Sequence, residues 1–373
     1  MHKRIKKVMI LLFIVPFLLC GCWDEKIVDK TGFITALGVE SSSTTDLNLT
    51  YGMPTIDPTS KSYAEILDTS ASLLRMARNK LRLQSAKTIE AGKIQFIIYS
   101  KGIAEDFPIE NVNAIFEREP SNPILAWVVV VDGSPRNLFH TAAEYKDKPR
   151  PSLYITALLG RAAAGAYTPE TRMYDFDIKS VAKGIDNITS FIRFDSKAVE
   201  VTGSALFSGS KMVGTINPRE TGLLIAMMKT LKNKSYNYVA GDITEDTNIP
   251  KHGIAIALGQ NSKKITISIK DNKPVVDIYL DLNGFIDEHK WGNLNDEKEV
   301  KKLSSHIEGE IQRDCQKLIM TLQEMQSDPI GIGDMVRVKY NNYFKRVNWH
   351  EVYKIAPITI HVKFNIIGHG AIQ

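Results

Sequence analysis

Hydrophobic and polar residues alternate along much of the chain, and the period of this alternation predicts the strands. Alternating runs at residues 32–40 and 46–52, separated by a short polar segment, predict a hairpin. Residues 125–131 are apolar at every position, which indicates a central strand covered on both faces. Further strands are predicted at residues 93–100, 199–207 and 211–216.

Helical spacing of apolar residues alternates with these strands. Residues 62–83 have apolar side chains three or four positions apart and basic residues in the second half, which predicts an amphipathic helix. Another helix is predicted at 218–231, where Pro218 occupies a first-turn position that tolerates proline. Shorter helices are predicted at residues 111–119, 153–164 and 176–185.

The last third of the chain has a simpler pattern. A helix is predicted at 296–325, and about 30 residues at 1.5 Å each give a rod of roughly 45 Å. A half-buried strand follows at 358–367. Three antiparallel strands are predicted before the helix, at residues 253–258, 264–270 and 275–283. This end of the chain is therefore expected to be one long helix on a sheet.

Together these elements predict an α+β protein with three domains of mixed or antiparallel sheets and packed helices. The middle domain can share strands with the N-terminal hairpin at 32–51. The predicted boundaries are a lipoprotein signal peptide at 1–21, an N-terminal α+β domain at 22–190, a middle α+β domain at 191–260, and a C-terminal α+β domain at 261–373 that contains the helix 296–325.

The first residues have the layout of a secretory signal peptide: a basic head followed by an apolar run at 8–19. That run is shorter than the roughly 20 residues that span a bilayer. Leu19, Cys20, Gly21 and Cys22 then resemble a bacterial lipobox. We expect a signal peptidase to recognise Leu19, Cys20 and Gly21 and to leave Cys22 as a first residue that carries a diacylglyceryl group and possible N-acylation. Two acyl chains anchor stably.

Two other interpretations of this segment remain open: an ordinary signal peptide in which cysteines occur by chance, and an uncleaved signal anchor.

The predicted signal peptide, residues 1–21, also accounts for most of the positive net charge of the chain. The chain has 47 Lys and Arg against 42 Asp and Glu, and four of the cations lie within residues 1–21. The remainder, 43 against 42, is nearly neutral and gives no reason to expect a nucleic-acid partner. After cleavage, Cys22 and Cys315 are the two cysteines that remain. Because Cys22 would carry the lipid, we expect no intramolecular disulfide in the processed chain.

Few sequence motifs point to catalysis. Ser-x-x-Lys occurs at Ser180 and at Ser208, and Lys-Thr-Gly at residues 30–32, but their order differs from that of penicillin-binding proteins. His306 and Glu310 are expected to form a helix-surface pair, and Cys315 to act as a small hydrophobic residue. We therefore predict no catalytic residue, no metal and no cofactor beyond a covalent lipid on Cys22, and we assign no ligand-binding residue.

Three blocks of sequence resemble a known family. The first is residues 22–24 with 32–40; the second is 203–207 with 211–214 and 220–224; the third is 328–333 with Trp349, Tyr353 and a strand that ends at Gly368. Their order and spacing resemble the Ger(x)C family, the lipoprotein C subunits of bacterial spore germinant receptors. One departure is the segment 337–346, where the family often has more aromatic and basic residues. Gly331, Gly333 and Trp349 suit turn and core roles as well as functional ones.

The resemblance implies three α+β domains and a non-enzymatic role in nutrient-triggered spore germination. It implies two integral-membrane partner subunits, one with a large soluble domain and one similar to an amino-acid transporter. The acyl anchor and the bilayer would then hold this chain on the outer face of the spore inner membrane.

Two other classes of function are carried forward. A solute-binding lipoprotein of a transporter shares the anchor and the size, but such proteins usually have two doubly wound lobes. A cell-envelope enzyme would need closely paired acids in a deep cleft.

Overall fold

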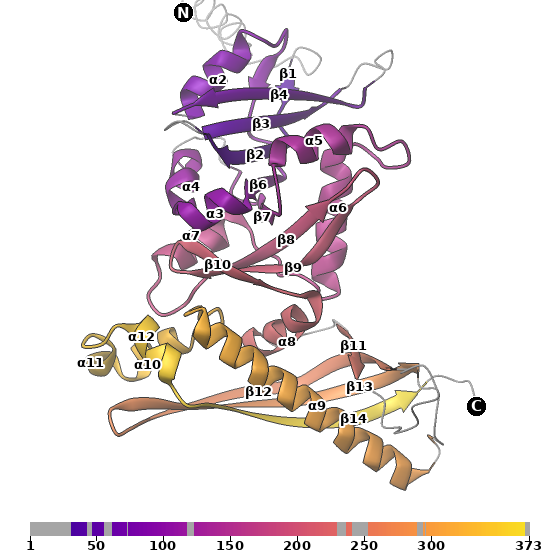
Figure 1. Ribbon diagram of the computed structural model, residues 1–373, viewed down its shortest axis with the longest axis vertical. Helices are drawn as coiled ribbons and strands as arrows, with labels where there is room; N and C mark the ends of the chain where they lie inside the picture. The colour runs from indigo at the N-terminus through magenta and orange to yellow at the C-terminus, as the bar shows by residue number, and fades with distance from the viewer. Residues whose placement is uncertain are drawn as a thin grey trace, which may run out of the picture.

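The computed structural model describes residues 31–42, 47–55, 62–72, 74–117, 123–229, 236–240, 253–288, 294 and 296–369. These residues form an eight-stranded sheet, a four-stranded sheet and a two-stranded sheet. Figure 1 shows the eight-stranded sheet in the upper part of the molecule and the four-stranded sheet below it, so that the two follow each other along the longest axis.

The eight-stranded sheet has the strand order β10-β9-β8-β7-β6-β2-β3-β4. Its four central strands are parallel and the outer pairs are antiparallel. Beside it, β1 (Thr31–Phe33) pairs with β5 (Thr88–Glu90). The strands of the large sheet are β2 (Ala36–Ser41), β3 (Leu47–Pro54), β4 (Ala64–Ala71), β6 (Phe96–Ser100), β7 (Trp127–Val131), β8 (Ile188–Phe194), β9 (Val199–Ser208) and β10 (Lys211–Ile216).

Helices cover both faces of this sheet, which explains why its central strands are apolar throughout. Side chains of α5 (Pro135–Ala143) and α6 (Pro151–Ala164) pack against one face, on Ile98 and Val129. The neighbouring residues of the same strands point to the opposite face. That face is covered by α2 (Leu74–Arg82), α3 (Lys101–Asp106), α4 (Ile109–Glu117) and α7 (Met173–Val181).

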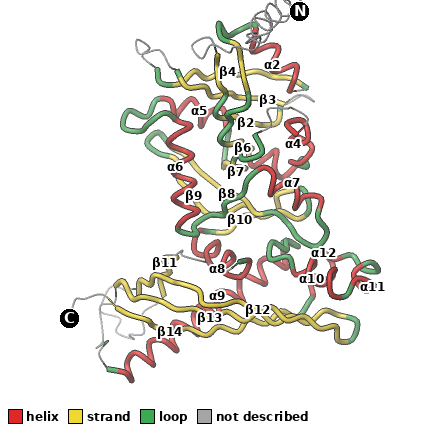
Figure 2. The backbone as a smooth tube through the Cα atoms, turned by 180° about the vertical axis from the view of Figure 1, so that it is seen from behind, coloured by secondary structure: helices red, strands yellow, loops and turns green. Residues whose placement is uncertain are grey.

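The four-stranded sheet has the order β11-β12-β13-β14, and helices pack on one of its faces. The long helix α9 lies in front of these strands in Figure 1 and behind them in Figure 2. Its apolar stripe joins the buried side of β13 in one core with α8. The elements are α8 (Pro218–Met228), β11 (Tyr236–Ala240), β12 (Ile254–Lys270), β13 (Lys273–Glu288), α9 (Glu297–Glu324), α10 (Ile332–Lys339), α11 (Asn341–Phe344), α12 (Trp349–Ile355) and β14 (Ile358–His369).

Polar side chains of α9 cover the free edge of β14. Gln316 donates to the carbonyl of Ile358 at 2.9 Å and accepts from the amide of Ile360 at 3.2 Å. The same pattern continues along the helix with Gln312 on Val362, Glu308 on the Phe364 amide and Ser304 on the Phe364 carbonyl. Residues four apart on a helix rise about 6 Å, close to the roughly 6.6 Å between alternate strand residues. The edge is thus closed to further strand pairing.

Two predicted elements are wrong. The first half of the helix predicted at 62–83 is strand β4, and only its second half is helical, as α2. Every residue of β4 pairs with β3, and this pairing outweighs the helical spacing of a segment whose Asp68, Thr69 and Ser70 are weak helix formers. The strands predicted at 253–258 and 264–270 are one strand, β12, because a register shift at Gln260 and Ser262 accommodates the polar residues as a bulge.

The α+β class and the long C-terminal helix on a sheet are confirmed. Asp296 caps α9 by accepting from the amide of Lys298 at 2.8 Å, and β14 matches the predicted final strand. The boundary predicted after residue 190 lies inside β8, and the one after residue 260 lies inside β12. Segment 191–260 contributes β9 and β10 to the sheet that holds the N-terminal hairpin. The division into three domains stays a prediction, and the signal peptide 1–21 lies outside the described residues.

Candidate functional site

The predicted lipidation segment lies outside the described residues. Leu19, Cys20, Gly21 and Cys22 all precede Thr31, the first described residue, so the lipid site stays a prediction. Strand β1, which begins at Thr31, lies at the upper end of the longest axis in Figure 1.

Within the described parts of the chain, none of the helices combines the length and the apolar character that a membrane crossing needs.

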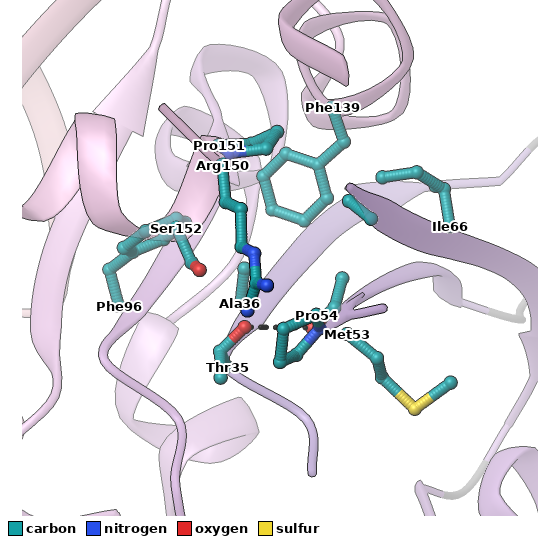
Figure 3. A pocket seen from close by; sticks show the side chains of 12 residues that line it. Thr35, Ala36, Met53, Pro54, Ile66, Phe96, Phe139, Arg150, Pro151 and Ser152 are labelled. Carbon is teal, nitrogen blue, oxygen red and sulfur yellow. Dashed lines mark hydrogen bonds between the residues drawn. The ribbon is translucent and has the colours of Figure 1, made fainter. Parts of the chain in front are cut away.

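A small cavity lies between the β2-β3-β4 part of the large sheet and the segment that joins α5 to α6. Figure 3 shows Phe139 and Arg150 on one side of it and Thr35 and Pro54 on the other. Thr35 donates to the carbonyl of Gly52 at 3.2 Å. The cavity has a volume of about 10 Å³, which suffices for about one water molecule. It is therefore a packing gap that is too small for a larger ligand.

A densely hydrogen-bonded polar site lies where the two large sheets meet, around the buried Asp328. Its carboxylate accepts from the amides of Gly331 and Ile332, both at 3.0 Å, and from the amide of Gly333 at 2.7 Å. The indole Nε1 of Trp349 donates to the same carboxylate at 3.0 Å. The four donors occupy both carboxylate oxygens and fix the turn that begins α10.

This geometry explains the glycines of segment 328–333. Gly331 has a φ of +77°, a left-handed conformation that disfavours a side chain. A Cβ on Gly333 would lie 2.3 Å from the Trp349 indole nitrogen. Both glycines and Trp349 therefore have turn and packing roles around Asp328.

Asp186, in the loop between α7 and β8, connects this turn to the eight-stranded sheet. Its carboxylate accepts from the amide of Asp328 at 2.7 Å and from the amide of Gly209, in the β9-β10 turn, at 2.7 Å. The Asp186 amide in turn donates to the carbonyl of Asp328 at 3.0 Å. His350 Nε2 lies 3.3 Å from the Asp186 carboxylate. We call Asp186, Asp328, Trp349 and His350 the junction cluster.

Further hydrogen bonds join the two sheets beside the junction cluster. Ser327 donates to the carbonyl of Phe207 at 2.6 Å, and Ser208 donates to the carbonyl of Gln326 at 2.8 Å. The amide of Asp334 donates to the carbonyl of Gly184 at 2.7 Å. The contact thus involves main-chain groups of both units, which fixes their relative orientation.

Burial governs the charges in the junction cluster. Asp328 has no exposed surface, and burial raises its pKa to about 7, although the hydrogen bonds from Gly333 and Ile332 oppose this rise. The hydrogen bond to Asp186 raises the pKa of His350. Because the Asp328 oxygens are already occupied by donors, this arrangement can hold two units together but offers no free acid to a substrate.

Other residues singled out from the sequence have structural roles. The Ser180 hydroxyl donates to the carbonyl of Phe176 at 2.9 Å, so both Ser-x-x-Lys serines bond to main-chain carbonyls. His306 and Glu310 pair on α9 at 3.7 Å, both partly buried. Cys315 is fully buried on the apolar stripe of α9, as predicted, and burial raises its pKa to about 12. In the described residues, no group of three or more His, Cys, Asp or Glu side chains could hold a metal ion.

Asp186 was not predicted from the sequence, because its contact with Asp328 joins residues 142 positions apart. No local motif surrounds Asp186. Only pairing across the two sheets, which a single sequence does not show, identifies it.

Comparisons with known proteins cover both sides of the junction. The family described as "Spore germination protein N-terminal domain" matches residues 24–193, and "Spore germination B3/ GerAC like, C-terminal" matches residues 202–370. Asp186 therefore lies in the first match and Asp328 in the second.

The chain is also similar to curated proteins and to a solved structure. It is 22% identical to spore germination protein GerQC of Bacillus cereus, over 96% of this chain and 95% of that protein. It is 20% identical to spore germination protein B3 of Bacillus subtilis (strain 168), over 97% of each. The crystal structure of the GerBC protein has the same fold, with a TM-score of 0.56 and 16% identity over 89% of this chain and 96% of that one. The chain thus belongs to the Ger(x)C family of spore germination proteins.

Proposed function

We propose that this chain is a membrane-anchored, non-catalytic subunit of a spore germinant receptor and is needed for nutrient-triggered germination. The observation that carries the proposal is the similarity of nearly the whole chain, on both sides of the junction, to proteins named for spore germination. A shared fold with the GerBC protein supports it.

The proposed anchor is a diacylglyceryl group on Cys22, with Leu19, Cys20 and Gly21 as the signal peptidase recognition residues. The basic head, short apolar run and lipobox-like residues support this assignment. We place the chain on the outer face of the spore inner membrane. There it assembles with two integral-membrane subunits, one with a large soluble domain and one transporter-like.

A non-catalytic role is supported by the environment of the buried acids. The Asp186 carboxylate accepts from the Asp328 amide across the junction, and the Asp328 carboxylate is occupied by main-chain amides of its own turn. We propose that the chain acts by assembly, with the junction cluster fixing the relative orientation of its two sheets.

The transporter alternative fits this fold poorly. A solute-binding lipoprotein usually has two doubly wound lobes, each with its own parallel sheet. In the described residues, the four-stranded sheet has one parallel pair, β13 with β14, and the long α9 covers one of its faces.

The anchor is tested by replacing Cys22→Ala and measuring incorporation of labelled fatty acid. We expect the label and the membrane association to be lost, because the thiol that carries the lipid is absent. Cys315→Ala is the matched control, since it removes a buried thiol and leaves residues 19–22 unchanged. Persistent labelling of the Cys22→Ala chain would contradict a lipid anchor on Cys22.

The receptor role is tested separately by deleting the gene and following spore germination in a panel of nutrients. We expect slower germination in at least one nutrient and normal vegetative growth. A normal response to every germinant tested would contradict the proposal, whatever the labelling experiment shows.

A further inference from the structure

An open groove lies between the tip of the β12-β13 hairpin and the helices α10 and α11, at one end of the four-stranded sheet. It has a volume of about 710 Å³ and is lined in part by Asn272, Lys339, Tyr340, Asn341, Tyr343 and Arg346. This volume falls in the range of about 300 to 1,000 Å³ typical of ligand pockets. The groove is separate from the junction cluster.

Hydrogen bonds between the two walls hold the groove in shape. Tyr340 and Lys339 both donate to the carbonyl of Ile267, at 3.2 Å and 2.8 Å, and Tyr343 donates to the carbonyl of Asn272 at 3.1 Å. The hairpin turn itself is tight, because Asp271 and Asn272 both have positive φ, at 47° and 58°. The groove is thus formed before any ligand arrives, which lowers the entropic cost of binding.

Positive charge gathers around the groove. Lys339 and Arg346 line it, and Lys345 adjoins them on α11's C-terminal side. Lys270 and Lys273 flank the turn, in which Asp271 is the only acid. In the part of the chain that the structure describes, no acidic side chain forms an ion pair with Arg346 or Lys345. This concentration contrasts with the near-neutral charge of the chain beyond residue 21.

We propose that this groove binds an acidic, extended peptide segment of a partner protein. Lysine and arginine side chains would pair with the carboxylates, and arginine can do so through two parallel hydrogen bonds. The amides of Asn272, Asn341 and Asn342 supply donors and acceptors that match a peptide main chain. The rings of Tyr340 and Tyr343 add rigid contact area.

The shape and position of the groove favour a peptide over an anionic bilayer. A groove encloses an extended chain, whereas a membrane surface needs a flat or convex basic face. Figure 1 shows β1 at the end of the longest axis opposite to α11. The eight residues between Cys22 and Thr31 span at most about 30 Å. This positional argument rests on the proposed anchor, but the shape and charge of the groove do not.

The test is fluorescence anisotropy of the detergent-purified full chain with a labelled peptide of alternating glutamate and glycine. A peptide with glutamine in place of glutamate is the control ligand. We expect saturable, salt-sensitive binding of the glutamate peptide, roughly tenfold tighter than that of the glutamine peptide. A double variant, Lys345→Glu and Arg346→Glu, should weaken this binding by roughly tenfold or more, because both charges are reversed.

The matched control is the double variant Lys301→Glu and Lys302→Glu, which reverses two exposed charges on α9. It should bind as the unaltered chain does, and circular dichroism confirms that both variants fold. Equal binding of the two peptides, an equal loss in both variants, or no saturable binding at millimolar peptide would overturn the proposal. So would binding only to phosphatidylglycerol vesicles. None of these outcomes bears on the germination phenotype of a deletion, so the two proposals fail separately.

Discussion

The two large sheets differ in how many of their faces are covered. In the eight-stranded sheet, every residue of β7 is buried because helices pack on both faces. In the four-stranded sheet, β13 alternates between buried and accessible residues, and Tyr279 and Phe285 are 42% and 40% exposed on the open side. Among the described residues, helices cover both faces of the first sheet, whereas one face of the second sheet has no helix packed on it. We therefore expect surfaces for assembly mainly on the C-terminal half, which also holds the groove.

The junction cluster links these unlike halves, and its loss should have the largest effect. Replacing Asp328→Ala leaves four buried or partly buried donors without an acceptor. Each such donor costs about 1 to 3 kcal/mol, so we expect the free energy of unfolding to fall by about 4 kcal/mol or more. Urea unfolding measures this change. Asp334→Ala, which removes a partly exposed acid paired with Arg337, is the control and should cost about 0.5 kcal/mol. Equal losses of stability in the two variants would show that the junction cluster stabilises the fold no more than a surface ion pair does.

The ionisable groups of the junction cluster predict that the free energy of unfolding depends on pH. The pKa of Asp328 is raised to about 7 in the folded chain, so between about pH 4 and pH 7 the folded state binds more protons than the unfolded state. The free energy of unfolding should therefore fall as pH rises through this range, by at most about 4 kcal/mol. The raised pKa of His350 acts with the same sign, but at pH values above the usual histidine pKa of about 6.5. Urea midpoints across this range measure the slope, which Asp328→Asn should reduce; an unchanged slope would exclude Asp328 as its source.

The covered and open sheets can be compared directly with one substitution in each. Val129→Ala removes two methyl groups from a strand buried on both faces and should cost about 2 to 3 kcal/mol. Val239→Ala makes the same change at a residue of β11 that is half exposed, and should cost about 0.5 kcal/mol. Thermal unfolding of the two variants gives the difference. Equal costs would show that the open face is covered in solution.

The covered edge of β14 predicts a smaller loss. Gln316→Met keeps the length of the side chain but removes the hydrogen bonds to the Ile358 carbonyl and the Ile360 amide, so it should cost about 1 to 2 kcal/mol. Its neighbour Lys317 is exposed, and Lys317→Met should be neutral within about 0.5 kcal/mol. Chemical denaturation compares the pair. A neutral Gln316→Met would indicate that water replaces the glutamine at this edge.

Sequence periodicity predicted those elements whose own residues determine their structure. The apolar run of β7 and the long stripe of α9 were assigned correctly, because burial on two faces or along one stripe leaves a direct record in the order of residues. The helix prediction was wrong at residues 62–72, because pairing with the neighbouring strand β3 determines the conformation of this segment. The prediction of two strands at 253–258 and 264–270 was wrong for a related reason. Pairing with β13 continues across the polar residues between them, so β12 forms a bulge there and not a turn.

The candidate sites were less predictable than the fold. The turn around Asp328 falls in segment 328–333, which the family resemblance includes. There the close contact with Trp349 requires Gly333, and the left-handed backbone requires Gly331. Asp186 and the groove carried no such signal, since both depend on segments brought together from distant parts of the chain.

The proposed role of this chain is that of a subunit in a membrane receptor complex. The most direct measurement is affinity purification of the tagged chain from detergent-solubilised spore membranes, followed by identification of the proteins that remain bound. We predict recovery of two integral-membrane germination proteins, one with a large soluble domain and one transporter-like. Recovery of a permease and an import ATPase in their place would contradict the claim and support the solute-binding alternative.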